Sequence, residues 1–324
     1  MKNTAYRKNV RKLLVLTVLM IIAVVLYMTV DVNFANPKFL QFSMKIRAPK
    51  LLAMLVAAFA IGAASIIFQS IINNTIVTPC LLGMNSLYTL LHTAVYFFLG
   101  SASFLATNAN AAFIVDLLLM VVVATFIYGF LFKKTNYNVL YVLLIGTVLS
   151  SFFGSIQSTL VRVMDPNEYD ALLLTLVAGF DNINGEIIGC CVLLLLLLTY
   201  VLREDLKLLD VITLGKDQAI NLGVDYDRCI GRLLVGVTAC IAVATAMVGP
   251  ISFLGLIIAN LGRQIMKTYR HTHLILGAAL FGMMALVAGQ FLVEHVFAYA
   301  VPVSVFITLG GGIYFLYLLL KKKS

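Results

Sequence analysis

Long apolar runs, separated by short stretches with charge, proline or glycine, are the feature that most constrains how this chain folds. A run of about 20 mostly apolar residues is long enough to cross the hydrocarbon core of a bilayer as a helix. Ten runs follow one another along the sequence, and their boundaries are set by the interrupting residues. They lie at residues 13–30, 51–72, 81–99, 110–132, 139–161, 187–202, 231–249, 251–266, 274–297 and 302–320.

The amino-acid composition is typical of an integral membrane protein. Of its 324 residues, 62% are hydrophobic and 11% are charged, whereas a soluble domain has about 25% charged residues. The connections between runs leave no room for a soluble catalytic domain. We therefore predict an all-α polytopic membrane protein with about ten transmembrane helices, in which residues 1–324 form a single transmembrane domain.

The distribution of lysine and arginine predicts the orientation. With a cytoplasmic N-terminus and ten crossings, 18 of the 23 basic residues lie inside, as the positive-inside rule requires. Both termini are then cytoplasmic. We expect the first run to be a retained helix, because no convincing signal-peptide cleavage site follows it. Topology also explains the net charge of +9, so we expect no nucleic-acid partner. The basic residues left outside are Lys38, Lys45, Arg47, Lys50 and Arg162.

Few residues in these runs could carry chemistry. Asp116 and Glu294 are the acidic residues of the runs, and we expect His92 to be a packed polar residue near the middle of its helix. The sequence has no HExxH, GxSxG or Walker A motif, and its five cysteines have no zinc-like spacing. We therefore expect no catalytic residue, metal site or cofactor in this chain. A membrane-embedded enzyme or scaffold, or a secondary transporter, would need clustered ionisable groups at one depth.

Two segments depart from a plain helix bundle. The connection at residues 203–230 is long for a turn, and residues 212–224 predict a short amphipathic helix that ends at Gly223. That helix could rest on the membrane surface or dock another protein. On the outer side, the sequence has a basic cluster where the positive-inside rule predicts few basic residues. It consists of Lys45, Arg47 and Lys50. They could extend to lipid phosphates, which composition favours, or meet acidic residues of a partner protein.

Four blocks of sequence occur in an order and spacing that one transport family shares. The first runs from the second apolar run into the third, and the others follow toward the C-terminus. They comprise Arg47-Ala-Pro-Lys50 with Gly62 to Ser65, Gln69, Asn74-Thr-Ile76 and Pro79-Cys-Leu-Leu-Gly83; Leu214-Gly-Lys-Asp-Gln-Ala-Ile-Asn-Leu-Gly223; Gly249-Pro-Ile-Ser-Phe-Leu-Gly-Leu256; and Thr308-Leu-Gly-Gly-Gly-Ile-Tyr-Phe-Leu-Tyr317.

On these blocks the chain resembles the FecCD/BtuC-like permeases of ABC importers, which take up iron–siderophore complexes, haem and vitamin B12. The resemblance implies a bacterial cytoplasmic-membrane protein that moves an iron–siderophore complex by alternating access, with haem or cobalamin as alternative substrates. It implies four kinds of neighbour. These are a second permease, two ATP-binding cassette subunits that hold the ATP and magnesium, an extracytoplasmic substrate-binding protein, and membrane lipid.

The resemblance also assigns roles to residues. It places the binding-protein docking site at Arg47 and Lys50, and the cytoplasmic gate at Asn74, Thr75 and Ile76. It assigns contact with the ATPase subunits to residues 203–230, through Leu214, Gly215, Ala219, Leu222 and Gly223.

Three substitutions depart from the family pattern. Thr75 stands where the family has proline, Ala259-Asn260 replaces Pro-His, and Ser304 replaces glycine. All three lie near elements that pack closely or move. They suggest one member of a pair of different permeases, and a homodimer stays open as the alternative.

Overall fold

The computed structural model describes residues 2–135, 139–180, 183–298 and 300–321, and these segments form helices joined by short loops. In chain order the helices are α1 (Lys2–Thr29), α2 (Pro37–Ile72), the 3-10 turn η1 (Pro79–Leu82), α3 (Met84–Leu99), α4 (Phe104–Thr107), α5 (Ala109–Lys134), α6 (Val139–Val163), α7 (Pro166–Leu176), α8 (Gly185–Val201), α9 (Arg203–Ile212), α10 (Lys216–Asn221), α11 (Tyr226–Val248), α12 (Leu254–Met266), α13 (His271–His295) and α14 (Val303–Lys321).

Each of the ten predicted apolar runs coincides with a helix, so the all-α membrane class is confirmed. Among the described residues, 7 helices are long and apolar enough to cross a membrane, and α8 with α9, bent by 58° at Leu202, makes up to 8. Helices α3 and α12 are shorter, with 16 and 13 residues. The count of ten crossings stays a prediction.

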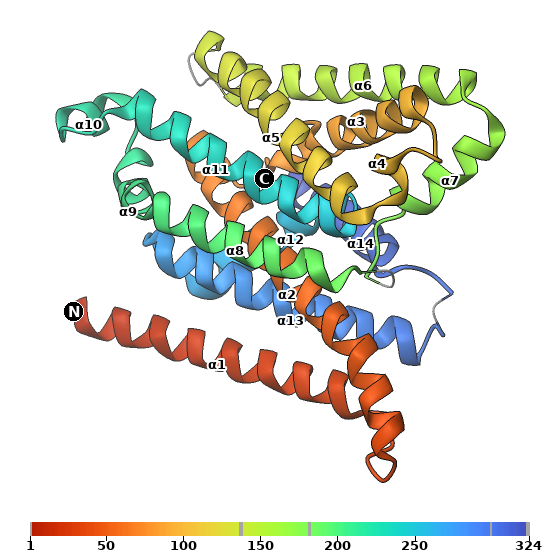
Figure 1. Cartoon of the computed structure of the whole chain (residues 1–324). Helices are drawn as coiled ribbons and strands as arrows, with labels where there is room; N and C mark the ends of the chain where they lie inside the picture. The colour runs from red at the N-terminus through yellow and green to blue at the C-terminus, as the bar shows by residue number, and fades with distance from the viewer. Residues whose placement is uncertain (1, 136–138, 181–182, 299, 322–324) are drawn as a thin grey trace.

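Helix α2 forms the centre of the bundle. It packs against α13, α11 and α12, and 83% of its most apolar window is buried. Figure 1 shows α2 (orange) running through the middle of the molecule. Close packing depends on small residues: a Cβ added at Gly262 of α12 would lie 2.9 Å from the Ala278 Cα atom of α13. In lipid, such small residues allow helix backbones to approach each other.

Local sequence sets several helix ends. Asn36 accepts hydrogen bonds from the first amides of α2 and Pro37 follows it, a combination typical of a helix start. Helix α2 begins 14 residues before the predicted run and continues through Pro49. Asp165 and Pro166 start α7 in the same way. The predicted apolar runs do not include α7, because this helix is short and amphipathic.

The bundle has two distinct ends. In Figure 1, the N-terminus, α9 and α10 lie at one end, here called the α10 end. Helices α4 and α7 and the loop between α1 and α2 lie at the opposite end, the α7 end.

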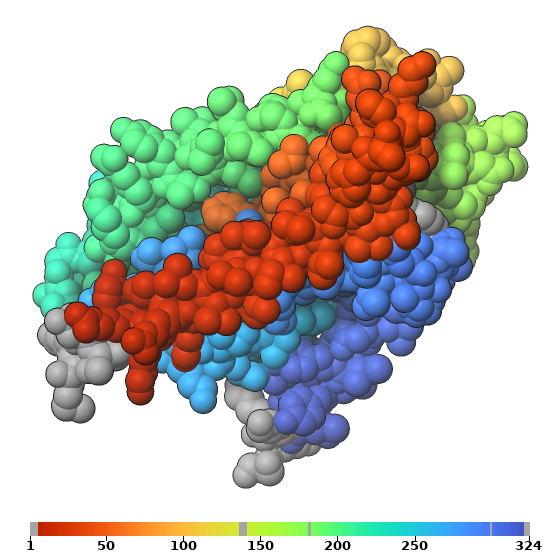
Figure 2. All heavy atoms as spheres, turned by 90° about the horizontal axis from the view of Figure 1, so that it is seen from below, coloured from red at the N-terminus to blue at the C-terminus, as the bar shows by residue number. Residues whose placement is uncertain are grey.

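Three long helices lie at the periphery. Only 11% of the apolar window of α1 and 17% of those of α6 and α14 are buried. Figure 2 shows α1 (red) lying across one face and α14 (dark blue) projecting at its edge. These helices therefore offer their surfaces to lipid or to partner chains.

Candidate functional site

A row of hydroxyl groups runs along the exposed face of α6. Thr147, Ser151, Ser155 and Thr159 are spaced by four residues, which places them on one side of a helix, and all four are exposed. The Ser151, Ser155 and Thr159 hydroxyls each donate to the carbonyl four residues earlier, at 3.1, 2.8 and 2.8 Å. Each hydroxyl oxygen can still accept a hydrogen bond. We call this row the α6 stripe.

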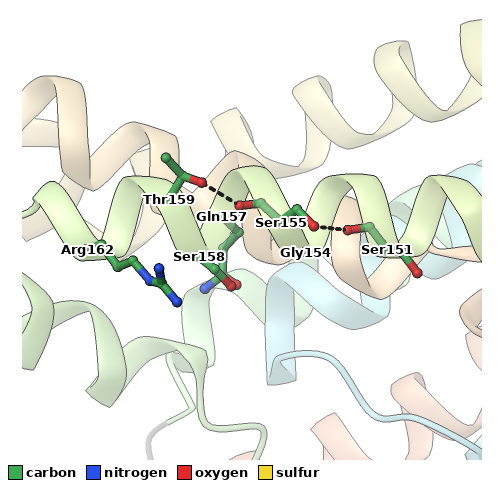
Figure 3. Close-up of a pocket in the computed structure, with 7 residues that line it drawn as sticks. All are labelled: Ser151, Gly154, Ser155, Gln157, Ser158, Thr159 and Arg162. Carbon is green, nitrogen blue, oxygen red and sulfur yellow. Dashed lines mark hydrogen bonds between the residues drawn. The ribbon is translucent and has the colours of Figure 1, made fainter.

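The α6 stripe borders a hollow of about 440 Å³. Gln157, Ser158 and Arg162 line it together with the hydroxyls, and Gly154 leaves room where a side chain would project. Figure 3 shows Arg162 at one end of the row. An arginine and several hydroxyls on a membrane helix are costly to expose to lipid, so this face is suited to water, solute or protein.

A second hollow, of about 570 Å³, lies along α14. Ser304 at the start of α14 donates to the Ala178 carbonyl at 2.6 Å, an interaction that the glycine of the family pattern cannot make. The serine therefore ties α14 to the segment after α7. The hollow is lined by Ala178, Pro250, Ser304, Val305, Thr308, Leu309, Gly312, Ile313 and Leu316.

The turn after α2 contains the predicted gate residues, and two side chains hold it. The Thr75 carbonyl accepts from the Gln69 Nε2 atom at 2.7 Å and from the Asn260 Nδ2 atom at 2.8 Å. The Asn74 side chain accepts from the Ile76 amide at 2.9 Å. Asn73 begins the turn in the left-handed region, at φ 54°. Asn260, the residue that departs from the family pattern, thus binds the backbone of this turn directly.

Arg263 reinforces the same contact from the next turn of α12. Its Nε atom donates to the Gln69 Oε1 atom at 3.1 Å, and its guanidinium also donates to the Ser70 hydroxyl at 3.0 Å. Gln69 is thereby oriented to donate to Thr75. Neither Asn260 nor Arg263 was predicted as a gate residue. The available signal was an arginine within an otherwise apolar run at residues 251–266.

We expect Asn260→Leu to loosen the Thr75 turn. The leucine has a similar size but no hydrogen to donate, and one such bond is worth about 1 kcal/mol, or about fivefold in an opening equilibrium. Hydrogen–deuterium exchange of residues 73–78 should become about fivefold faster. Gln264→Leu on the same helix is the control, because Gln264 bonds to Tyr314 instead. Equal exchange in the two variants would show that Asn260 does not hold the turn.

The predicted coupling residues divide into exposed and buried groups. Leu214 and Leu222 are 52% and 64% exposed, and Ile220 beside them is 50% exposed, so apolar side chains project from the α10 end. Ala219 is fully buried beneath them. Gly215 and Gly223 adopt φ of 105° and 84°, which other residues rarely adopt, and begin and end the turn around α10. The short helix is confirmed, although it begins at Lys216 rather than at residue 212.

Two carboxylates tie α9 to the bundle. The Asp205 Oδ1 atom lies 2.9 Å from the Arg232 guanidinium of α11. The Asp210 Oδ1 atom accepts from the backbone amide of His271 at 2.9 Å and lies 2.6 Å from its Nδ1 atom. Asp210 therefore caps the start of α13 from another element. These contacts connect α9 to α11 and to α13.

The predicted docking residues occupy different environments. Arg47 is half-buried and donates to the Tyr27 and Val30 carbonyls at 2.8 and 2.7 Å. Lys50 is 7% exposed, and its Nζ atom lies 3.7 Å from the Glu294 carboxylate. The sequence predicts Lys50 as part of a docking surface with Arg47, whereas in the structure α13 covers Lys50 and supplies an acidic partner. Lys45, one turn before Pro49, is exposed.

The α6 stripe is the feature that sequence reasoning missed. The signal was present as serine and threonine at every fourth position within an apolar run, from Thr147 to Thr159. Such residues normally back-bond within their own helix and then carry no information about function. Their exposure on one face, beside Arg162, emerges only from the packed structure.

Comparison with known proteins agrees with this architecture. Residues 10–321 match the FecCD transport family. The petrobactin import system permease YclO of Bacillus subtilis (strain 168) is 38% identical over 317 residues, covering 98% of this chain and 99% of YclO. The petrobactin import system permease FatC of Bacillus anthracis is 31% identical over 289 residues, covering 89% of this chain and 81% of FatC.

A solved structure shows the same fold. A metal-chelate type ABC transporter in an inward-facing conformation superposes with a TM-score of 0.79 at 22% identity, covering 97% of this chain and 99% of that one. The family match extends over nearly the whole sequence, and the helices of the two folds correspond. The chain therefore belongs to the FecCD transport family and is a multi-pass permease of the bacterial cytoplasmic membrane rather than an enzyme.

Proposed function

We propose that this chain is a permease subunit of an ATP-driven importer for an iron–siderophore complex, with the α6 stripe lining its path. The observation that carries the proposal is the exposed row of hydroxyls ending at Arg162 on a helix long enough to cross the membrane. Two relatives are named for petrobactin, others for iron(3+)-hydroxamate and ferric enterobactin, and one for hemin. The petrobactin relatives are 38% and 31% identical and the hemin relative 27%, which favours a siderophore over haem or cobalamin.

The chemistry of the stripe suits a chelated iron. A siderophore already fills the coordination sphere of the metal, so the path needs hydrogen-bonding groups rather than metal ligands. Hydroxyls and the Gln157 amide offer such groups, and Arg162 attracts a negatively charged complex. One chain supplies one wall of the path, and a second permease, identical or different, supplies the other.

The orientation follows from charge. With most lysine and arginine residues on the cytoplasmic side, the α10 end faces the cytoplasm and the α7 end faces outward. Helices α3 and α12 then complete ten crossings as short spans within the protein. Helix α2 runs inward, so the Asn74–Ile76 turn lies at the cytoplasmic exit, where a gate would stand.

The proposed partner proteins bind at opposite ends of the bundle. Two ATP-binding cassette subunits would each receive the apolar side chains of one α9–α10 segment, and ATP-driven closure would move α9. The substrate-binding protein would dock at the α7 end, with Arg47 and the neighbouring Lys45 facing its carboxylates. Lys50, which is buried beneath this surface, would stabilise it through the ion pair with Glu294.

Substituting the centre of the stripe tests the path. We expect Ser155→Leu to lower uptake of the ferric siderophore at least fivefold, because it removes a hydrogen-bonding group and adds bulk in the hollow. Ser155→Thr keeps the hydroxyl and should retain uptake. Initial rates in cells expressing the whole importer, with iron-labelled siderophores of several classes, labelled haem and labelled cobalamin, provide the measurement.

Two results would contradict the proposal. Uptake of haem or cobalamin but of no ferric siderophore by the parent would overturn the substrate class. Parent-level uptake by Ser155→Leu would place the path away from α6.

A further inference from the structure

A histidine and an aspartate form a buried pair between α3 and α5. The His92 Nδ1 atom lies 2.7 Å from the Asp116 Oδ2 atom, and the two residues are 6% and 4% exposed. A pair of ionisable groups among apolar helices is costly, and an apolar pair of similar volume would stabilise the bundle as well or better. Its presence points to a function other than packing.

The other ring nitrogen of His92 reaches α7. Its Nε2 atom lies 3.0 Å from the Thr175 hydroxyl, in the last turn of α7. Tyr88 stacks on the imidazole at 5.6 Å between ring centroids, and the Tyr96 ring lies at 5.2 Å. The ring is therefore held in one orientation, with one nitrogen toward α5 and the other toward α7.

Thr175 provides the contact on α7. Its hydroxyl donates to the Leu172 carbonyl at 2.8 Å, so its oxygen can accept from the His92 Nε2 atom. The Nδ1 atom pairs with the Asp116 carboxylate. Both ring nitrogens of His92 therefore take part, and the imidazole connects α5 to α7.

A second contact fixes the first turn of α7. The Glu168 carboxylate accepts from the backbone amide of Ser101, in the loop after α3. Between the two contacts, Leu172 is fully buried against Tyr96 and Met164. Helix α7 is thus attached near one end to the loop after α3 and near the other end to α3 itself, as its position beside α3 and α4 in Figure 1 illustrates.

Helix α7 connects the two hollows. It begins at Pro166, after the end of α6 that carries Arg162, and it leads to Ala178, which lines the hollow along α14. Two hydrogen bonds hold the segment after α7. The Gly179 amide donates to the Val248 carbonyl at 3.0 Å, and the Ser304 hydroxyl donates to the Ala178 carbonyl. A shift of α7 would therefore move one end of each hollow.

We propose that His92, Asp116 and Thr175 form a latch that positions α7, and through it the outer ends of both hollows, for transport. These are positioning residues, since none of them lines either hollow. The role in transport rests on the proposed function. The attachment of α7 does not, and it can be measured without substrate.

The test compares variants of one hydroxyl in the assembled importer in lipid nanodiscs. Thr175→Val keeps the shape but cannot accept from His92, whereas Thr175→Ser keeps the hydroxyl. Leu174→Ala, at a leucine of α7 that is 83% exposed, is the control. Asp116→Leu is the second test, because it leaves the buried Nδ1 atom of His92 without a partner and no longer holds the ring toward Thr175.

We expect amide exchange over residues 166–176 to be about fivefold faster in Thr175→Val and in Asp116→Leu, and unchanged in Thr175→Ser and Leu174→Ala. The maximal uptake rate should fall by a similar factor in the first two variants. The KM for the loaded binding protein should stay constant, and Thr175→Ser should restore the rate.

Two outcomes would overturn the latch: parent-like exchange in Thr175→Val, or faster exchange with unchanged uptake. If the parent imports no ferric siderophore while exchange still follows the hydroxyl, the proposed function fails and the attachment of α7 stands.

Discussion

Lys50→Ala is expected to lower the free energy of unfolding by about 3–5 kcal/mol, the cost of removing one partner of a buried ion pair. The Glu294 carboxylate accepts from the Tyr27 hydroxyl and from Gln290, each at 3.0 Å, but these bonds leave its charge without a counterion. Helices α1, α2 and α13 meet at this carboxylate. Unfolding of the purified permease in mixed micelles, followed by helical circular dichroism, would measure the loss.

Two further variants make the result specific. Lys45→Ala removes an exposed lysine of the same helix and should cost less than about 0.5 kcal/mol. Lys50→Met combined with Glu294→Gln removes both charges and should recover most of the stability. A similar loss for Lys45→Ala and Lys50→Ala would argue against a buried pair.

Leu214→Glu with Leu222→Glu is expected to reduce binding of the ATPase subunits at least about a hundredfold and to abolish uptake. Burying one leucine at an interface is worth about 1.5–3 kcal/mol, and tenfold in affinity corresponds to about 1.4 kcal/mol. Both side chains are more than half exposed, so the permease itself should fold normally. Retention of the ATPase during purification, and uptake in cells, provide the measurements.

The choice of residues follows from their environments. Ala219 is fully buried and Gly215 has φ 105°, so bulky replacements there would disturb α10 itself. Gln218→Glu adds one negative charge at an exposed polar position of α10 and is the control, with near-parent binding expected. If the double variant retains the ATPase as well as this control, the coupling surface lies elsewhere.

The membrane class and most helices could be predicted because hydropathy is a local property. A run of apolar residues finds its lowest free energy as a helix in lipid whatever its neighbours are. Helix α7 was missed for the opposite reason, since 11 residues with a polar first turn do not form a span. Its Asp165-Pro166 start was nevertheless a readable helix signal.

The turn after α2 illustrates the limit of contiguous motifs. The motif predicts Asn74 to Ile76 as one segment, and in the structure these residues form the turn that follows α2, while their role as a gate stays a prediction. Their stabilisation by Asn260 was not predictable, because the donor and the Thr75 carbonyl are 185 residues apart. Such a contact depends on the close packing of α12 against α2 and α13, where Gly262 allows the helices to approach.

The sequence by itself determined the membrane location, the helical class and the family, because these depend on local hydropathy and contiguous motifs. Only the tertiary structure decided which polar residues are exposed and which are paired. From the sequence, Lys50 is one of the outer basic residues and His92 is a packed polar residue. In the structure, Glu294 of α13 pairs with Lys50, and α5 and α7 provide the partners of His92. The physical reason is that a charge acquires its energy and its role from groups brought close in space, and chain folding alone places them.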